Sequence, residues 1–191
     1  MSQPHQPGDD APTHYRFYRR SISDAAPQVS PVISEGQVTL WRPSWRRVPP
    51  ALLRSRVTWV WWLFHNLHVF RSRAFSIILV SREGRLLHRS SVFPPYFRFP
   101  FMRQADVQIG DTWTDESVRG RGIATAVIGV ALTLPARRDG DAWYIVEDDN
   151  RASIRAVEKA GFALVGRGER LPRLGLRALG YYAITEPCIP S

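Results

Sequence analysis

The sequence predicts a mixed α/β domain, and three features of the chain lead to that prediction. Two strand–turn–helix units follow one another between residues 106 and 160, each with a β-rich run, a polar turn and a helix. Arg82-Glu83-Gly84-Arg85 separates two strand-like runs and is typical of a hairpin turn. A second hairpin closes the chain. Periodicity alone supports this broad class and no finer one.

The elements follow in order from local patterns. The predicted strands are 37–41, 74–81, 86–92, 106–114, 142–147, 162–166 and 176–184, and the predicted helices are 122–134, 152–160 and one or two within 48–71. In the helix over 152–160, Ile154 and Val157 share the face that packs inward. Gly161 suits the left-handed conformation that follows a helix end.

Length and composition predict one domain. A chain of 191 residues with 44% hydrophobic content can bury one full core. Residues 1–14 are polar, which predicts a disordered N-terminal tail before a single domain over 15–191. The tail has no signal-peptide pattern, and the one cysteine, Cys188, can form no internal disulfide. These features favour a cytoplasmic protein.

The strongest functional signal lies in Val118 to Ala124, between a strand and a helix. Gly120 and Gly122 have no side chains, so this turn can curl with its N–H groups pointing inward. The first N–H groups of the next helix, at the positive end of its dipole, also attract negative charge. The pattern predicts an anion site, and an unliganded glycine turn is the alternative.

Two motifs carry a family resemblance. Residues 119–124 (Arg-x-x-Gly-x-Ala) resemble the Gln/Arg-x-x-Gly-x-Gly/Ala pyrophosphate loop of the GNAT superfamily of acyl-CoA-dependent N-acetyltransferases. Some thirty residues later, 150–153 (Asn-x-x-Ser) and 158–162 (Glu-Lys-Ala-Gly-Phe) resemble the segment after the fifth strand of that family. The resemblance is clear over 74–184 and weak over the first seventy residues.

The resemblance implies a GNAT-like α/β fold with a mixed, mostly antiparallel central sheet flanked by helices. The fourth and fifth strands, here 106–114 and 142–147, are expected to splay apart at their C-terminal ends. In that family the pantetheine arm of acetyl-CoA lies between them and pairs with the backbone of the fourth strand. The residues implied to bind acetyl-CoA are Trp113, Thr114, Arg119, Gly120, Arg121, Gly122, Ile123, Ala124, Asn150 and Ser153.

The formal net charge of +9 also favours an anionic ligand. Lys159 is the only lysine, so nearly all the positive charge is arginine, and coenzyme A with its three phosphate groups fits such a field. Nucleic acid is disfavoured as a partner, because the arginines are scattered and no zinc-ligand spacing or recognition-helix motif is present. An arginine-rich surface without a specific ligand is the alternative.

Acyl transfer to an amine requires a group that takes the proton of the amine. A carboxylate on the fourth strand often does so in the family, and Asp106 and Asp111 are the candidates here. Asp106 is favoured because it shares a strand face with Gln108, with a solvated strand-end carboxylate as the alternative. No activated Cys or Ser nucleophile is visible, so direct transfer in a ternary complex is expected.

The departing thiolate needs a proton donor or a path to water. Many family members carry a tyrosine for this purpose four residues before the glycine of Gly-Phe, where this chain has Val157. That departure leaves Ser153, a water molecule or another tyrosine such as Tyr144. Ser153 could instead cap its helix or bind the cofactor.

The aromatic segment 93–101 is predicted to contact the acceptor through Tyr96 and Arg98, because aromatic rings beside one arginine suit a sugar or a planar group. A loop that plugs the end of the sheet is the alternative. We expect a small-molecule amine, such as an amino sugar or a nucleotide sugar, since a cationic enzyme repels a lysine-rich chain. An acyl-CoA-binding protein with little turnover, and a protein or peptide N-acetyltransferase, remain alternatives.

Residues 56–70 form the most apolar segment, which is too short to span a bilayer. A buried helix is the first interpretation, and a helix that contacts a partner or a membrane surface is the second. His65 and His68 share a helical face, but no carboxylate or thiol is nearby, so no metal is expected. The sequence leaves the oligomeric state open.

Overall fold

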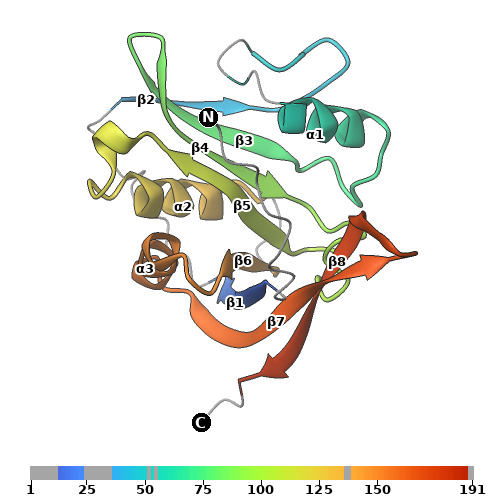
Figure 1. Cartoon of the computed structure of the whole chain (residues 1–191). Helices are drawn as coiled ribbons and strands as arrows, with labels where there is room; N and C mark the ends of the chain where they lie inside the picture. The colour runs from blue at the N-terminus through green and yellow to red at the C-terminus, as the bar shows by residue number, and fades with distance from the viewer. Residues whose placement is uncertain (1–12, 24–35, 51–52, 54–55, 136–138, 189–191) are drawn as a thin grey trace, which may run out of the picture.

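The computed structural model describes residues 13–23, 36–50, 53, 56–135 and 139–188. One eight-stranded sheet runs through them in the order β2-β3-β4-β5-β6-β1-β7-β8 (Figure 1). The strands are β1 (His14–Ser21), β2 (Gln37–Trp41), β3 (Ser76–Arg82), β4 (Arg85–Phe93), β5 (Val107–Thr114), β6 (Asp141–Glu147), β7 (Ala163–Arg173) and β8 (Leu176–Pro187). The helices are α1 (Arg56–Asn66), α2 (Ile123–Thr133) and α3 (Arg151–Lys159), with a short 3-10 helix at Glu116–Val118. Neighbouring strands are antiparallel except β5 and β6, which pair in parallel.

Helices cover both faces of this sheet, and each face has its own hydrophobic cluster. Ile78 and Val80 of β3 belong to the first cluster, which includes the buried residues of α2 and α3. Ile77 and Leu79 point to the opposite face and belong to the second cluster, together with Trp61 of α1. The helices α2 and α3 therefore share one face of the sheet, and α1 covers the other.

The predicted α/β class is confirmed, and the elements that the sequence predicted are present. Most ends shift by a few residues, whereas β7 runs on to Arg173. The predicted hairpin turn joins β3 to β4, and Glu83 and Gly84 in it have φ angles of 51° and 77°. Positive φ at both central residues is the conformation of a two-residue type I′ turn, whose twist matches the flanking strands.

The sequence analysis missed one strand, β1, which lies inside the sheet between β6 and β7. It begins at His14, the last residue of the predicted tail, and residues 1–12 lie outside the described part of the chain. Phe17 and Tyr18 are adjacent in sequence and both buried, because both faces of β1 are covered. A strand of this kind lacks the alternation of polar and apolar residues that marks a half-buried strand.

The ladder between β5 and β6 is short. It joins Val107–Ile109 of β5 to Ala142–Tyr144 of β6, although β5 continues to Thr114 and β6 to Glu147. Further along β5, its register with β4 shifts by one residue in a β-bulge, and Asp111 in that bulge has a φ of 47°. The candidate site lies beside this C-terminal half of β5.

Candidate functional site

A cavity of about 860 Å³ lies at the C-terminal end of β5, between the first turn of α2 and the side of α3. The residues predicted to bind the cofactor meet in it, apart from Arg121. They are Trp113, Thr114, Arg119, Gly120, Gly122, Ile123, Ala124, Asn150 and Ser153. Residues from two motifs thirty positions apart in the sequence thus line one hollow of the surface.

The turn before α2 uses the conformational freedom of its two glycines. Gly120 and Gly122 both have a φ of 79°, a left-handed conformation that side chains other than glycine rarely adopt. A Cβ atom at either position would meet no described heavy atom within 4 Å, so these two backbone positions face open space. Gly122 is the N-cap of α2, and its carbonyl accepts a hydrogen bond from the N–H of Ala126. A ligand can therefore approach the backbone at the positive end of the α2 dipole.

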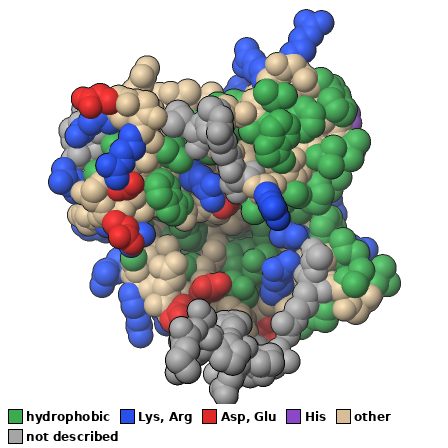
Figure 2. Space-filling view, turned by 45° about the horizontal axis from the view of Figure 1, so that its top comes forward, with side chains coloured by type: hydrophobic (Ala, Val, Ile, Leu, Met, Phe, Trp, Pro, Cys, Tyr) green, Lys and Arg blue, Asp and Glu red, His purple; other side chains and the backbone are tan. Residues whose placement is uncertain are grey.

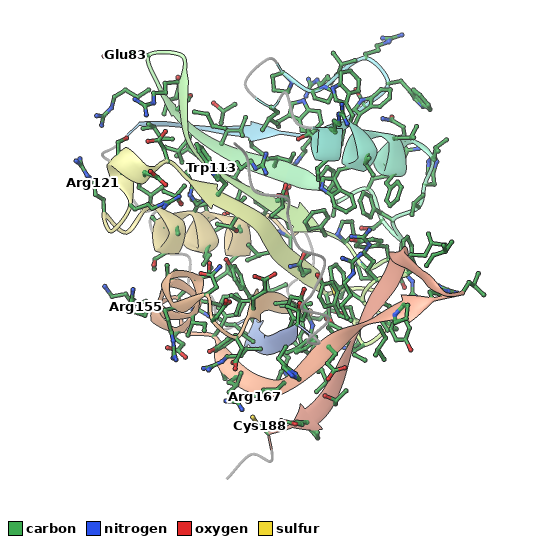
Figure 3. The ribbon with its side chains drawn as sticks, viewed as in Figure 1. Glu83, Trp113, Arg121, Arg155, Arg167 and Cys188 are labelled. Atoms are coloured by element: carbon green, nitrogen blue, oxygen red, sulfur yellow. The ribbon has the colours of Figure 1, made fainter. Side chains whose placement is uncertain are left out.

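The two arginines of the turn lie in different places. The Arg119 guanidinium donates to the carbonyl of Thr114 at 3.2 Å and pairs with Glu116 at 3.2 Å, which ties the turn to the end of β5. Arg121 does not line the main cavity. It lines a smaller cavity of about 500 Å³ with Arg82 and Arg85, beside the β3–β4 hairpin (Figure 3).

Asp115 fixes the short 3-10 helix between β5 and the turn. Its carboxylate accepts hydrogen bonds from the backbone and hydroxyl of Ser117 and from the guanidinium of Arg85. These bonds, those from Ser117 first, lower the pKa of Asp115 to about 2. The carboxylate therefore stays charged at neutral pH and holds the turn against the β3–β4 hairpin.

On the other side of the cavity, α3 begins at a capped end. The side-chain oxygen of Asn150 accepts a hydrogen bond from the N–H of Ser153 at 3.1 Å, so Asn150 is the N-cap and also lines the cavity. Val157, where family members carry a tyrosine, is fully buried in the first hydrophobic cluster. Tyr144 of β6 does line the cavity, as does Ser153, so both hydroxyls remain candidates for the proton donor.

The unpredicted strand β1 anchors α3. The Tyr18 hydroxyl donates to Glu158 of α3 at 2.8 Å, and burial together with this carboxylate raises the pKa of Tyr18. Arg20 donates to the carbonyl of Ala160 at the end of the helix. Arg16 pairs with Asp148 just before the helix begins. The interior strand β1 thus fixes α3, which forms one wall of the cavity.

A buried polar chain behind this cavity escaped the sequence analysis. His88 of β4 is fully buried, and its ring nitrogens lie 2.8 Å from the hydroxyl of Thr114 and 3.0 Å from that of Ser90. The Ser90 hydroxyl lies 3.0 Å from that of Thr112, which lines the cavity with Thr114. Burial lowers the pKa of His88 to about 4, so the ring is neutral at pH 7. A lone histidine in a strand gives no sequence signal for such a chain.

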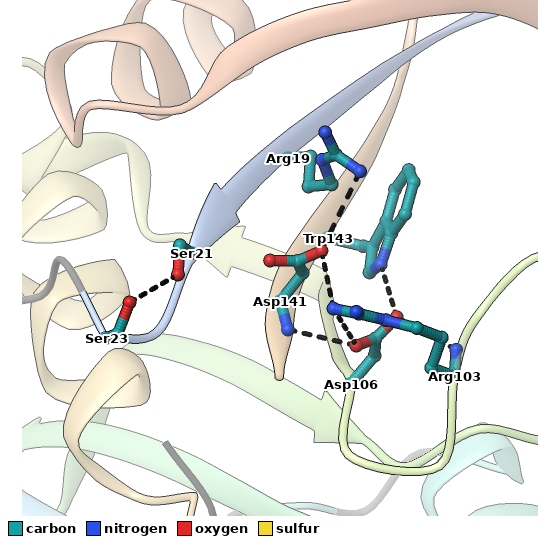
Figure 4. Close-up of polar contacts among 7 residues, drawn as sticks. All are labelled: Arg19, Ser21, Ser23, Arg103, Asp106, Asp141 and Trp143. Atoms are coloured by element: carbon teal, nitrogen blue, oxygen red, sulfur yellow. Dashed lines mark hydrogen bonds and ion pairs between the residues drawn. The ribbon is translucent and has the colours of Figure 1, made fainter. Parts of the chain in front are cut away.

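The structure does not bring Asp106, the favoured catalytic carboxylate, to the cavity. Asp106 lies in the turn before β5, at the opposite end of that strand, and is 2% exposed (Figure 4). It accepts hydrogen bonds from the backbone N–H groups of Arg103 and Asp141 and from the indole of Trp143, at 2.9 to 3.0 Å. This set of donors gives Asp106 a structural role, which joins the starts of β5 and β6.

Asp111 does not line the cavity either, but it is adjacent in sequence to Thr112, which does, and its carboxylate is partly buried. It sits in the β5 bulge, where its carboxylate pairs with Arg89 at 3.0 Å and contacts Ser91 at 3.5 Å. Burial raises the pKa of Asp111 although Arg89 opposes the shift, which makes the carboxylate a stronger base. Arg89, the partner of Asp111, is also paired across the strands with Trp113, which is 40% exposed and lines the cavity.

Tyr96 and Arg98, predicted to contact the acceptor, do not line the cavity: Tyr96 belongs to the second hydrophobic cluster, and Arg98 lies against it. Tyr96 is 3% exposed among aromatic rings, and burial raises its pKa. The Arg98 guanidinium lies over the ring of Trp61, at 5.5 Å from the ring centre, and near Phe97. This geometry fits the alternative interpretation of the aromatic segment, in which it plugs the end of the sheet.

The apolar segment 56–70 forms α1, which is buried on one side through Thr58, Trp61 and Asn66. In the described part of the chain, no helix has the length and apolar character needed to cross a bilayer. Over the same residues, no three His, Cys, Asp or Glu side chains are grouped as metal ligands would be. His68 instead lies beside the guanidinium of Arg73, at 2.6 Å.

Comparison with known proteins assigns the chain to a family. The model of the acetyltransferase (GNAT) family matches residues 37–162, about two thirds of the sequence. The chain therefore belongs to the GNAT acetyltransferase family. No curated protein sequence matches it.

Solved structures share the fold at low sequence identity. A protein from Novosphingobium aromaticivorans assigned to the GNAT family aligns with a TM-score of 0.52 and 17% identity, over 83% of this chain and 62% of that one. A GNAT-family acetyltransferase from Colwellia psychrerythraea gives 0.50 and 14%, over 80% and 53%. The glucosamine N-acetyltransferase region of a fungal multi-domain β-N-acetylglucosaminidase gives 0.52 and 11%, over 83% and 20%. The chain thus spans about three fifths of the first structure and half of the second.

Proposed function

We propose that this protein is an N-acetyltransferase that moves an acetyl group from acetyl-CoA to a primary amine of a small molecule. One observation carries the proposal. The glycine turn before α2, the end of β5 and the start of α3 enclose one cavity, and the predicted cofactor residues other than Arg121 line it. Family membership supplies the reaction class, and the cavity supplies a site of the right chemistry for a pyrophosphate.

In this proposal the pyrophosphate binds the backbone of Gly120, Gly122 and the first turn of α2. The pantetheine arm then runs along Thr112–Thr114, beyond the point where the β5–β6 ladder has ended. Because both contacts use backbone groups, the arginines of the turn serve mainly to shape it and to attract the anion. Arg119 fulfils the first role through its bond to the Thr114 carbonyl.

We propose Asp111, and not Asp106, as the group that removes the proton of the amine. The amine nitrogen attacks the thioester carbonyl, a C–N bond forms, and the C–S bond breaks to release the coenzyme A thiolate. The amine proton passes to Asp111, directly or through water, and the thiolate takes a proton from water or from a hydroxyl such as those of Tyr144 and Ser153. The raised pKa of Asp111 suits a base better than an ordinary carboxylate would.

The acceptor class follows from charge and from the exposed edge of the cavity. A chain with a formal charge of +9 repels polycationic substrates and draws in neutral or anionic ones, such as an amino sugar or a nucleotide sugar. The exposed indole of Trp113 offers a surface on which a sugar or a base can stack. A cytoplasmic location would give the enzyme ready access to acetyl-CoA.

Calorimetry with coenzyme A, together with a thiol-release assay using acetyl-CoA and an amine panel, tests the proposal. We expect coenzyme A to bind and amino sugars or nucleotide-linked amines to release thiol faster than polyamines or lysine-rich peptides. Binding without thiol release from any amine would identify an acyl-CoA-binding protein instead. Failure to bind coenzyme A would reject the cavity assignment.

The base is tested by two matched substitutions. Asp111→Asn should retain coenzyme A binding and lower kcat/KM by about 10²-fold or more, most strongly at lower pH, where more of the amine is protonated. Asp106→Asn should lower stability and leave the kcat/KM of the folded fraction near that of the parent. Equal pH profiles for Asp111→Asn and the parent would remove Asp111 from the mechanism.

A further inference from the structure

The outer side of α1 carries an exposed hydrophobic surface that the core does not use. Large apolar side chains there are between 42% and 63% exposed. We name them the α1 patch: Trp45, Val48, Val57, Trp59, Val60, Leu63 and Leu67. Figure 2 shows hydrophobic side chains gathered on the part of the surface where α1 lies. Burial of α1 against the sheet runs through other residues, and an exposed apolar surface of this size is typical of a contact site.

The aromatic part of the patch is held in place. The ring of Trp62 packs edge-on against Trp45 at 5.4 Å and against Trp59 at 5.7 Å, measured between ring centres. The indole N–H of Trp62 donates to the carbonyl of Ser44 at 3.0 Å, and Ser44 forms a backbone bridge with Arg47. Ordered tryptophans at an exposed surface provide apolar area with an N–H group at its edge.

The segment that holds the patch is positively charged. The sequence contains no Asp or Glu between Gly36 and Arg82, which is the segment that holds the whole patch. Exposed arginines lie in the same segment, both before and after the helix: Arg42, Arg46, Arg47, Arg56, Arg71 and Arg73. A segment that carries exposed apolar side chains and arginines without carboxylates complements a surface that is apolar inside and anionic outside.

We propose that the α1 patch docks on the surface of a bilayer that contains anionic phospholipids. Tryptophan prefers the boundary between headgroups and acyl chains, and arginines can reach the lipid phosphates while their stems lie along apolar surface. A helix of 11 residues with this composition lies in the plane of the interface and does not span it.

Charge also argues against two other occupants. A second copy of the chain would place arginines against arginines across a twofold axis. A nucleic acid would pair with the arginines and leave Val60, Leu63 and Leu67 without an apolar partner. The patch belongs to the α1 face of the sheet, opposite the helices that form the cavity, so docking leaves the proposed cofactor site open.

Vesicle binding of the full chain tests the proposal. We expect sedimentation with vesicles of phosphatidylcholine and phosphatidylglycerol to exceed that with phosphatidylcholine alone by tenfold or more, and to fall as salt rises. Lipids brominated on the acyl chains should quench tryptophan fluorescence. Binding that is equal on both vesicle types, or binding without quenching, would overturn the proposal.

Matched variants locate the contact. Trp59→Ser/Leu63→Ser and Arg46→Gln/Arg47→Gln should each reduce vesicle binding at least fivefold, with thermal melting and coenzyme A affinity near those of the parent. Arg151→Gln/Arg167→Gln removes the same charge from elsewhere and should change little; Arg167 lies far from α1 (Figure 3). The proposal fails if both arginine variants lose binding equally. The proposal also fails if Trp59→Ser/Leu63→Ser binds vesicles normally, or if that variant abolishes a dimer formed without lipid. Binding of duplex DNA to the patch as strong as that of vesicles would likewise contradict it.

Discussion

The two faces of the sheet are built from different side chains, and only one of them has a motif. The cluster under α2 and α3 consists mainly of Ile, Val, Leu and Ala, whereas the cluster under α1 consists mainly of Phe, Trp and Tyr. On the α2–α3 face a ligand would contact backbone groups at a glycine turn. On the α1 face, interaction would depend on side chains alone. A backbone site requires particular residues at fixed spacing, and an aromatic surface does not.

The two carboxylates of β5 and its preceding turn sharpen this comparison, because Asp106 joins the starts of β5 and β6, whereas Asp111 is the base that we propose. Asp106→Ala leaves the N–H groups of Arg103, Asp141 and Trp143 without their buried acceptor. We expect it to lower the free energy of unfolding by about 3–5 kcal/mol. Denaturant titration with Asp111→Ala as the control, which should cost clearly less, would measure the difference. Equal costs would contradict the division of roles.

Much of the fold could be predicted from the sequence, because glycines, turn residues and apolar runs mark elements locally. The strand β1 could not, since Phe17 and Tyr18 are buried on opposite faces and charged residues surround them. The residue at which β5 begins also affected the choice of catalytic carboxylate. The prediction started the strand at Asp106, one residue before β5 begins, and so treated a turn residue as part of a strand face.

The candidate site also has parts that the sequence could predict and parts that it could not. The glycines at 120 and 122 predicted an anion turn, and both have the left-handed backbone that admits few other residues. The segment with Tyr96 and Arg98 could not be assigned correctly, since aromatic residues that plug a core and those that bind a sugar have the same composition. His88 gave no signal either, because its partners Ser90 and Thr114 come together only in the folded sheet.

His88 allows a pH test of the polar chain behind the cavity. Its pKa falls from the usual 6.5 to about 4 on burial, so the unfolded chain binds a proton between these values and the folded chain does not. The free energy of unfolding therefore has its full value above pH 6.5. It falls by about 3 kcal/mol in total as the pH drops toward 4. His88→Gln should remove that part of the slope of unfolding free energy against pH. An unchanged slope would show that other groups cause it.

The smallest expected effect tests whether the α2–α3 face binds its ligand through the backbone. Gly122→Val places a β-branched residue at a φ of 79° and puts its side chain in the open space beside the turn. We expect the dissociation constant for coenzyme A, measured by calorimetry, to rise about tenfold, which corresponds to about 1.4 kcal/mol.

Gly84→Val is the matched control for that substitution. Gly84 has a φ of 77° and equally open surroundings, but it lies at the tip of the β3–β4 hairpin. Both variants strain the backbone alike, so their melting temperatures should fall by similar amounts. Only Gly122→Val should weaken coenzyme A binding, because only that residue stands where the phosphates would approach. A similar loss of affinity in both variants would mean that strain in the fold, and not contact at the turn, controls binding.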